Sequence, residues 1–126
     1  MSDDQDDDRE WIDTVAPTTY VLDAKLMATK EALFTECQRV LRFPDYFGRN
    51  WDALDECLRD LEWLEYPLQR LVIVDASELL VEGDDDDLAT FLSIVRDASN
   101  DGDFTVALHR PDARVWQAAA SNPVDD

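Results

Sequence analysis

Cysteine and histidine are scarce in this chain, and their scarcity excludes the common zinc sites and disulfide scaffolds. The 126 residues contain two cysteines and one histidine. Cys37 and Cys57 have no CxxC neighbour, so we expect neither a zinc site with His109 nor a disulfide framework. Both cysteines lie among apolar residues at helical spacing, which predicts buried, unreactive thiols. We expect no metal and no cofactor.

Basic residues are also few, and the resulting charge excludes whole classes of partner. The sequence has 11 Lys+Arg against 30 Asp+Glu, which gives a formal net charge of −19. Nucleic acids and anionic membranes would repel so acidic a chain, so we expect neither as a partner. The charge fits a basic protein partner or high solubility alone. The spread of aspartates also fits adaptation to high salt or a bias in base composition.

Long apolar runs are missing, although 45% of the residues are hydrophobic. No segment approaches the roughly 20 apolar residues that span a bilayer. The acidic start, Met1-Ser2-Asp3-Asp4, is the opposite of the basic start of a secretory leader. We therefore expect a cytoplasmic protein, and the length fits one small domain.

The two ends of the chain differ from its middle. Residues 1–17 begin with a run of aspartates, which predicts a disordered tail, either merely solvated or used for interaction. Trp11 and Ile12 within it are candidates to dock back onto the domain. We expect a folded domain over 18–110 and a C-terminal extension over 111–126.

Strand and helix patterns alternate along the middle of the chain. Short β-branched and aromatic runs predict strands at 18–22, 71–74 and 104–108. Apolar residues at helical spacing predict helices at 30–41 after the cap Thr29, at 51–63 between the cap Asn50 and Pro67, and in the segment after Asp84–Asp87. Pro111 and Asp112 predict a short last helix to Ala120, with Trp116 packing inward.

The order β-α-α-β-α-β predicts the fold class. Helical crossovers favour parallel neighbouring strands. We therefore predict an α/β fold with a small three-stranded parallel sheet flanked by helices. The continuous apolar run at 71–74 suits the middle strand, covered on both faces.

The predicted helix 51–63 has two different halves. One half is apolar and contains Ala53, Leu54, Cys57, Leu58, Leu61 and Leu64. The other half contains Asp52, Asp55, Glu56, Arg59, Asp60 and Trp63. Acidic groups beside an aromatic indicate a hot-spot cluster for a basic partner. An ordinary solvated face, with Trp63 just past the helix end, fits the pattern equally well.

The residues of this segment resemble a known family. Residues 43–58, FPDYFGRNWDALDECL, followed by WLEYPL at 63–68, resemble the signature of the barstar family, intracellular inhibitors of barnase-type ribonucleases. The strand order agrees, so the resemblance spans about 18–108. It implies a barstar-like fold and a protein that is not an enzyme.

The resemblance also implies a partner-binding surface on the predicted helix and the loop before it. The positions that it assigns are Tyr46, Gly48, Asn50, Asp52, Asp55, Glu56 and Trp63. Asp52 and Glu56 would supply anions, and Tyr46 and Trp63 would supply apolar anchors. Asn50 would add a polar contact.

Several positions depart from the family pattern. Glu56 stands where the family usually has Asp, and Asp55 stands where the namesake has an aromatic residue. A short insertion precedes Trp63. The family has a further acidic contact near the start of the third helix. In this sequence Ala89 occupies that position, with Asp86 and Asp87 close by.

The implied function is inhibition of a basic extracellular-type ribonuclease or toxin nuclease, in a one-to-one complex with a protein that is monomeric when free. Carboxylates on a rigid helix would mimic RNA phosphates in the cleft, as in an immunity protein. An acidic barstar-fold module for another basic protein is the alternative.

Catalysis is not expected, because the open helix face lacks a nucleophile and a histidine. The run Asp84–Asp87 lacks the spacing of a calcium loop.

Overall fold

Three parallel strands form the centre of the protein in a computed structural model that describes residues 18–102 and 104–120. The sheet has the order β1-β2-β3, with β1 at Thr19–Asp23, β2 at Arg70–Val74 and β3 at Thr105–Leu108. This arrangement confirms the predicted α/β class and places the 71–74 run in the middle strand. The predicted disordered tail, 1–17, lies outside the described residues.

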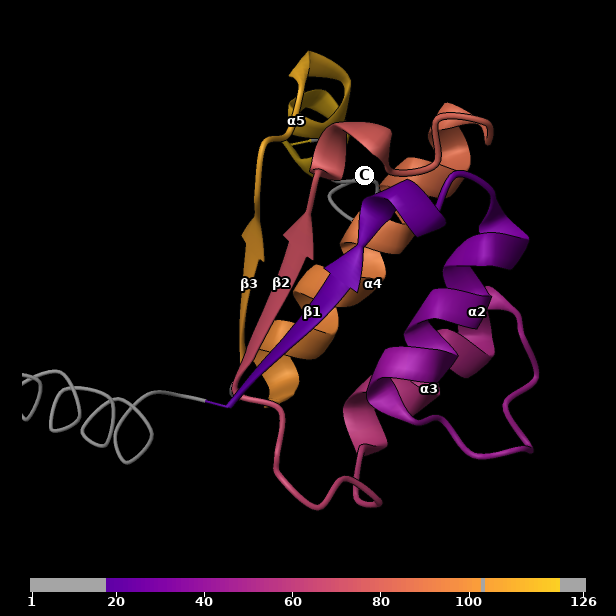
Figure 1. Cartoon of the computed structure of the whole chain (residues 1–126), viewed down its shortest axis with the longest axis vertical. Helices are drawn as coiled ribbons and strands as arrows, with labels where there is room; N and C mark the ends of the chain where they lie inside the picture. Colours follow the sequence, from indigo (N-terminus) through magenta and orange to yellow (C-terminus); the bar gives the residue numbers. More distant parts are fainter. Residues whose placement is uncertain (1–17, 103, 121–126) are drawn as a thin grey trace, which may run out of the picture.

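Helices make the connections between the strands (Figure 1). Two helices, α2 (Lys30–Leu41) and α3 (Trp51–Asp60), join β1 to β2, and α4 (Asp85–Gly102) joins β2 to β3. A short helix, α5 (Ala113–Ala120), follows β3. Single 3-10 turns, η1 (Ala24–Leu26) and η2 (Ala76–Glu78), follow β1 and β2. Among the described residues, no helix is both long and apolar enough to cross a membrane.

Side-chain caps fix where the helices begin. The Thr29 hydroxyl accepts a 3.1 Å hydrogen bond from the Ala32 N–H, and the Asn50 side chain accepts one of 2.7 Å from the Ala53 N–H. Each satisfies an N–H that the helix itself leaves without a partner. Both predicted caps are confirmed, and α2 has the predicted bounds.

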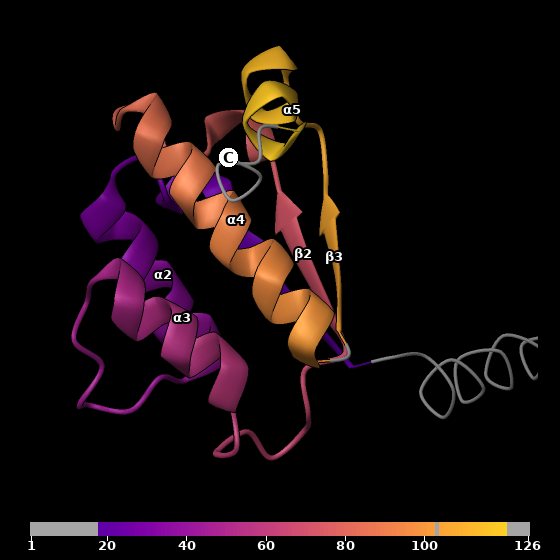
Figure 2. The same ribbon diagram turned by 180° about the vertical axis from the view of Figure 1, so that it is seen from behind.

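The middle strand is covered differently on its two faces, which corrects the expectation of cover on both. Leu71 and Ile73 are fully buried, whereas Val72 and Val74 are only half-buried. Figure 2 shows α4 crossing the face that buries Leu71 and Ile73, and Figure 1 looks onto the other face, where no described helix crosses the strands. The continuous apolar run therefore reflects β propensity on one face and core packing on the other.

Two helix predictions were wrong in detail. Helix α3 ends at Asp60, well before Pro67, because Leu61 takes a left-handed conformation with φ 49°. Trp116 does not pack inward but is 60% exposed. The α5 neighbours Val115, which is fully buried, and Arg114, which donates to the carbonyl of Leu79 at 2.5 Å, face the domain and turn Trp116 outward.

Candidate functional site

Aromatic packing holds the loop before α3. The Phe47 ring is buried and meets Phe43 edge-on at 4.9 Å and Phe34 of α2 at 5.9 Å between ring centroids. Trp51, at the start of α3, meets Phe34 edge-on at 5.1 Å. These contacts fix the loop against both helices. Tyr46 is left outside the cluster and is 75% exposed.

Arg49 ties the same loop to the outer side of α2. Its backbone is left-handed, with φ 55°, and its guanidinium donates to the carbonyl of Glu31 at 3.1 Å and to the Thr35 hydroxyl at 2.9 Å. Asn50 then caps α3, and its amide also donates to the Gly48 carbonyl at 3.4 Å. The loop and the first turn of α3 are therefore held together before any partner binds.

The loop and α3 enclose a hollow of about 230 Å³, which is smaller than a typical pocket for a drug-sized ligand. Its lining residues are Tyr46, Phe47, Gly48, Ala53, Glu56, Cys57 and Asp60, and we call it the α3 hollow. A Cβ on Gly48 would lie 3.6 Å from the Cβ of Ala53, so a larger side chain there would fill it. The hollow joins two of the predicted loop residues to a predicted carboxylate.

The α3 hollow is electrically negative. Glu56 and Asp60 lie one helical turn apart. Burial, followed by repulsion from Asp60 and Glu56, raises the pKa of the Cys57 thiol. A hydrogen bond with Asp60 and repulsion from its charge also raise the pKa of the neighbouring Glu62. Repulsion from neighbouring carboxylates thus contributes to both shifts, after burial for Cys57 and after the hydrogen bond for Glu62.

The exposed carboxylates of α3 divide into two groups. Asp52 and Glu56 have no ion-pair partner within the part of the chain that the structure describes. Asp55 instead pairs with Arg59 at 2.9 Å, and Arg59 also pairs with Asp101 of α4. The Arg59 guanidinium therefore pairs with Asp55 and links the two helices, whereas no cation of the described residues pairs with Asp52 or Glu56.

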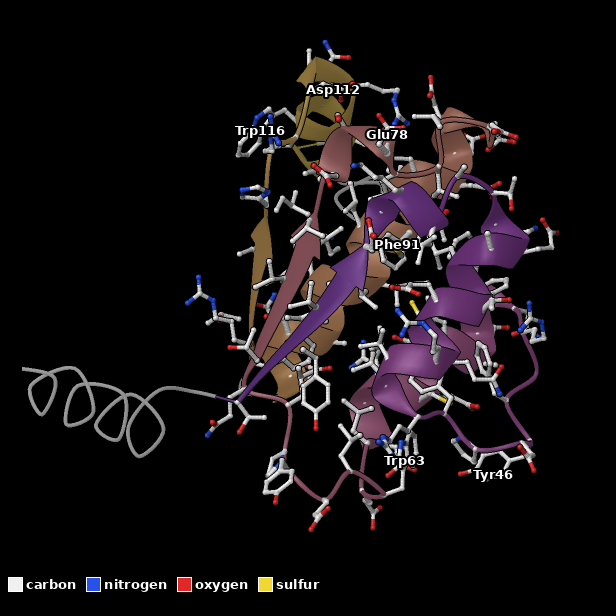
Figure 3. All side chains as sticks on the ribbon, in the orientation of Figure 1. Tyr46, Trp63, Glu78, Phe91, Asp112 and Trp116 are labelled. Atoms are coloured by element: carbon white, nitrogen blue, oxygen red, sulfur yellow. The ribbon has the colours of Figure 1, made fainter. Side chains whose placement is uncertain are left out.

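Trp63 lies apart from the α3 hollow. Its ring meets Phe43 edge-on at 6.1 Å, and its indole N–H donates to the Leu41 carbonyl at 2.9 Å. It lines a separate hollow of about 420 Å³ with Tyr20, Arg42, Leu64, Glu65 and Tyr66. Figure 3 shows Trp63 and Tyr46, one residue from the lining of each hollow, at the same end of the molecule.

The structure thus brings together only part of the predicted site. Tyr46, Gly48 and Glu56 share the α3 hollow, Asn50 organises it, and Asp52 is exposed on the first turn of the helix. Asp55 pairs with Arg59 of its own helix, and Trp63 donates to the end of α2, so these two residues are already engaged within the protein.

Two acidic residues were missed. Asp60 lines the α3 hollow, and its place four residues after Glu56 was a usable signal. Asp101 lies 42 residues from Arg59, so no pattern in the neighbouring sequence predicts their contact. Ala89 and Asp86, the positions considered for a further acidic contact, line a hollow beside α5 and not the α3 hollow.

Metal binding finds no support in this geometry. Within 18–102 and 104–120, no three His, Cys, Asp or Glu side chains are placed to hold a metal ion. Both cysteines are free and buried, as predicted.

A known protein family matches the part of the chain that contains this surface. The family model described as Barstar (barnase inhibitor) matches residues 18–110. The chain belongs to the barstar family. The resemblance carried by residues 43–58 is thereby confirmed, and the exposed carboxylates of α3 lie within the matched range.

One curated protein is similar to part of this barstar-family chain. It is named "Putative ribonuclease inhibitor YrdF", from Bacillus subtilis (strain 168). The two are 40% identical over 48 residues, which cover 38% of this chain and 50% of that protein. The chain thus matches about half the length of this relative.

Proposed function

We propose that this barstar-family protein inhibits a small basic ribonuclease by placing the free carboxylates of α3 in its cationic active-site cleft. The observation that carries the proposal is the pair Asp52 and Glu56, which are exposed, have no ion-pair partner among the described residues, and lie beside a hollow shared with Tyr46. Family membership supports an inhibitor, because the family is described by inhibition of barnase.

The mechanism follows from the chemistry of such clefts. A ribonuclease holds substrate phosphates with Lys and Arg side chains, and these cations lose their water when a partner covers them. Asp52 and Glu56 would take the places of phosphates while offering no bond to cleave. The Asn50 cap and the Arg49 anchor hold the carboxylates in place beforehand, which reduces the entropy lost on binding.

Tyr46 and Trp63 would supply the apolar contacts. Tyr46 is a largely exposed aromatic at the rim of the α3 hollow, a type of residue enriched in interface hot spots. Trp63 would offer only the part of its ring that Phe43 leaves uncovered. Asp55, already paired with Arg59, would contribute less than Asp52 or Glu56.

The net charge of −19 would accelerate the encounter with a basic enzyme. The barnase–barstar pair is the standard example of such electrostatic steering. We propose a one-to-one complex, with the inhibitor monomeric when free and acting in the cytoplasm as an immunity protein against a toxin nuclease. The free thiols of Cys37 and Cys57 suit such a reducing compartment.

Titration into a panel of barnase-type ribonucleases tests the proposal. We expect no RNA cleavage by the protein alone, and loss of cleavage by a susceptible enzyme near an equimolar ratio. Glu56→Gln should weaken the inhibition, whereas the matched control Glu82→Gln removes one exposed charge before α4 and should not. Failure to inhibit any enzyme of a broad panel would reject the proposal.

The same reagents test the alternative of a binding module for another basic protein. Immobilised wild-type protein and Glu56→Gln would be incubated with basic nucleases and with basic proteins that lack nuclease activity. Selective, Glu56-dependent retention of a protein without nuclease activity would favour the alternative. Retention of a nuclease, with loss of its activity, would support the inhibitor.

A further inference from the structure

The sheet has an outer face that the described helices leave open. In register across the three strands, Val21 pairs with Val72 and Val72 with Ala107, and Val74 follows on the middle strand. Side chains alternate along a strand, so these residues share the face opposite to Leu71 and Ile73. Val21 is 46% exposed, and we call this surface the outer sheet face.

Cations at the edges of the outer sheet face offset part of the charge of its two carboxylates, Asp23 and Asp75. Arg70 is exposed at its start, and Lys25 and Arg110 lie beyond the ends of β1 and β3. Lys25 and Arg110 both reach Asp75, at 3.6 Å and 3.8 Å, so one carboxylate is shared by two cations. An acidic segment is therefore repelled less here than over α3.

We propose that residues 11–16 cover the outer sheet face, with the acidic residues before them directed towards Lys25 and Arg110. The segment Trp11-Ile12-Asp13-Thr14-Val15-Ala16 is separated from the strand β1 by Pro17 and Thr18 and contains apolar side chains for the valines of the face. Residues 3–10 contain Asp3, Asp4, Asp6, Asp7, Asp8 and Glu10. The sequence of the segment thus matches the face in both apolar character and charge.

The chain from Trp11 to Thr18 is long enough to cross the outer sheet face. All three strands start at the same end of the sheet, which is where residue 18 enters it (Figure 1). Trp11 precedes Thr18 by seven residues and can lie up to about 25 Å away when the chain is extended. Three strands span only about 10 Å across and a five-residue strand about 17 Å along. Trp11 can therefore reach Val72, and residues 3–10 can reach the far end.

Paramagnetic broadening in the full chain tests this placement. A nitroxide is attached to the thiol introduced by Asp8→Cys, since Cys37 and Cys57 are buried. We expect the methyl signals of Val21, Val72 and Ala107 to be broadened, and those of Leu92 on α4 to be retained. Broadening spread equally over the outer sheet face and α4 would indicate a freely moving tail and would overturn the proposal.

A matched pair of variants shows whether the face itself holds the segment. Val21→Asp places a charge on the outer sheet face, and Val81→Asp places one at a site of similar exposure, 47% against 46%, outside the sheet. Val21→Asp should abolish the broadening of Val72 and Ala107, and Val81→Asp should preserve it. Loss in both variants, or in neither, would overturn the proposal.

A mixing experiment tests whether the segment that covers the outer sheet face comes from the same chain or from a second copy. Spin-labelled protein without isotopes is mixed with isotope-labelled protein that carries no nitroxide. We expect no broadening of Val72 in the mixture, because the segment binds within its own chain. Broadening there would show that another copy covers the face and would overturn the intramolecular assignment. None of these outcomes depends on a ribonuclease, so this proposal stands or fails separately from inhibition.

Discussion

The indole N–H of Trp63 donates a 2.9 Å hydrogen bond to the carbonyl of Leu41, the last residue of α2. The last carbonyls of a helix have no partner within it, so the bond satisfies a group that otherwise needs water or a cap. The loop after α3 is thereby tied to the end of α2. Trp63 has a structural role in the free protein, whatever it contributes to binding.

Trp63→Phe should therefore lower the free energy of unfolding even though the ring is retained. Loss of one hydrogen bond costs about 0.5–1.5 kcal/mol. Urea denaturation measures the change, with Trp116→Phe as the control at an exposed aromatic. Equal stability of both variants would show that the bond to Leu41 contributes nothing.

The adjacent residues Glu56 and Cys57 should separate binding from stability. Cys57 is buried, so Cys57→Ala should cost about 1 kcal/mol of unfolding free energy and leave affinity unchanged. Glu56 is exposed, so Glu56→Ala should leave the melting temperature unchanged. It should weaken binding to the nuclease by about 2–5 kcal/mol, because a cation of the nuclease would be left buried and unpaired. An early-melting Glu56→Ala that binds normally would reverse this assignment of the two faces.

Arg59→Gln should change association more than stability. Its two ion pairs are exposed, with side-chain exposures of 37% for Arg59, 38% for Asp55 and 62% for Asp101. Such pairs contribute less than about 1 kcal/mol to stability. Removing the cation leaves Asp55 and Asp101 without their ion pair and makes the protein more negative, which should raise the association rate with a basic nuclease at low salt.

Stopped-flow measurement at several salt concentrations checks this expectation. Lys25→Gln changes the net charge by the same amount, but Lys25 follows β1 and does not lie on α3. Its effect on the association rate should therefore be smaller. Both effects should fade as salt screens the charges, since the Debye length is about 8 Å at physiological ionic strength. A rate insensitive to salt would mean that charge does not drive the encounter.

The thiol of Cys57 reports on the charge of the α3 hollow. Burial is the main reason that its pKa is raised, and Asp60 and Glu56 add to it. The double variant Glu56→Gln, Asp60→Asn should lower this pKa and so increase the thiolate fraction and the alkylation rate at mildly alkaline pH. Mass spectrometry can follow each thiol separately. Cys37, whose pKa is raised mainly by burial, is the internal control and should remain slow.

Local sequence determined much of this protein. The caps Thr29 and Asn50 act on backbone groups three residues away, so their roles were predictable from the residues beside them. The same holds for the bounds of α2 and for the strand–helix order that predicts a parallel sheet. The loop and helix over 43–58 carried enough specific residues to indicate the barstar family.

Tertiary packing decided the rest, because it depends on residues that are distant in sequence. The periodicity of the sequence did not predict the position of Trp63, which depends on contacts with Phe43 and the end of α2. It also did not predict that Trp116 points outward, which follows from the burial of Val115. The pairing of Arg59 with Asp101 joins residues 42 positions apart. Which carboxylates of α3 pair with a cation of the described residues was therefore decided by the folded contacts and not by the helix pattern.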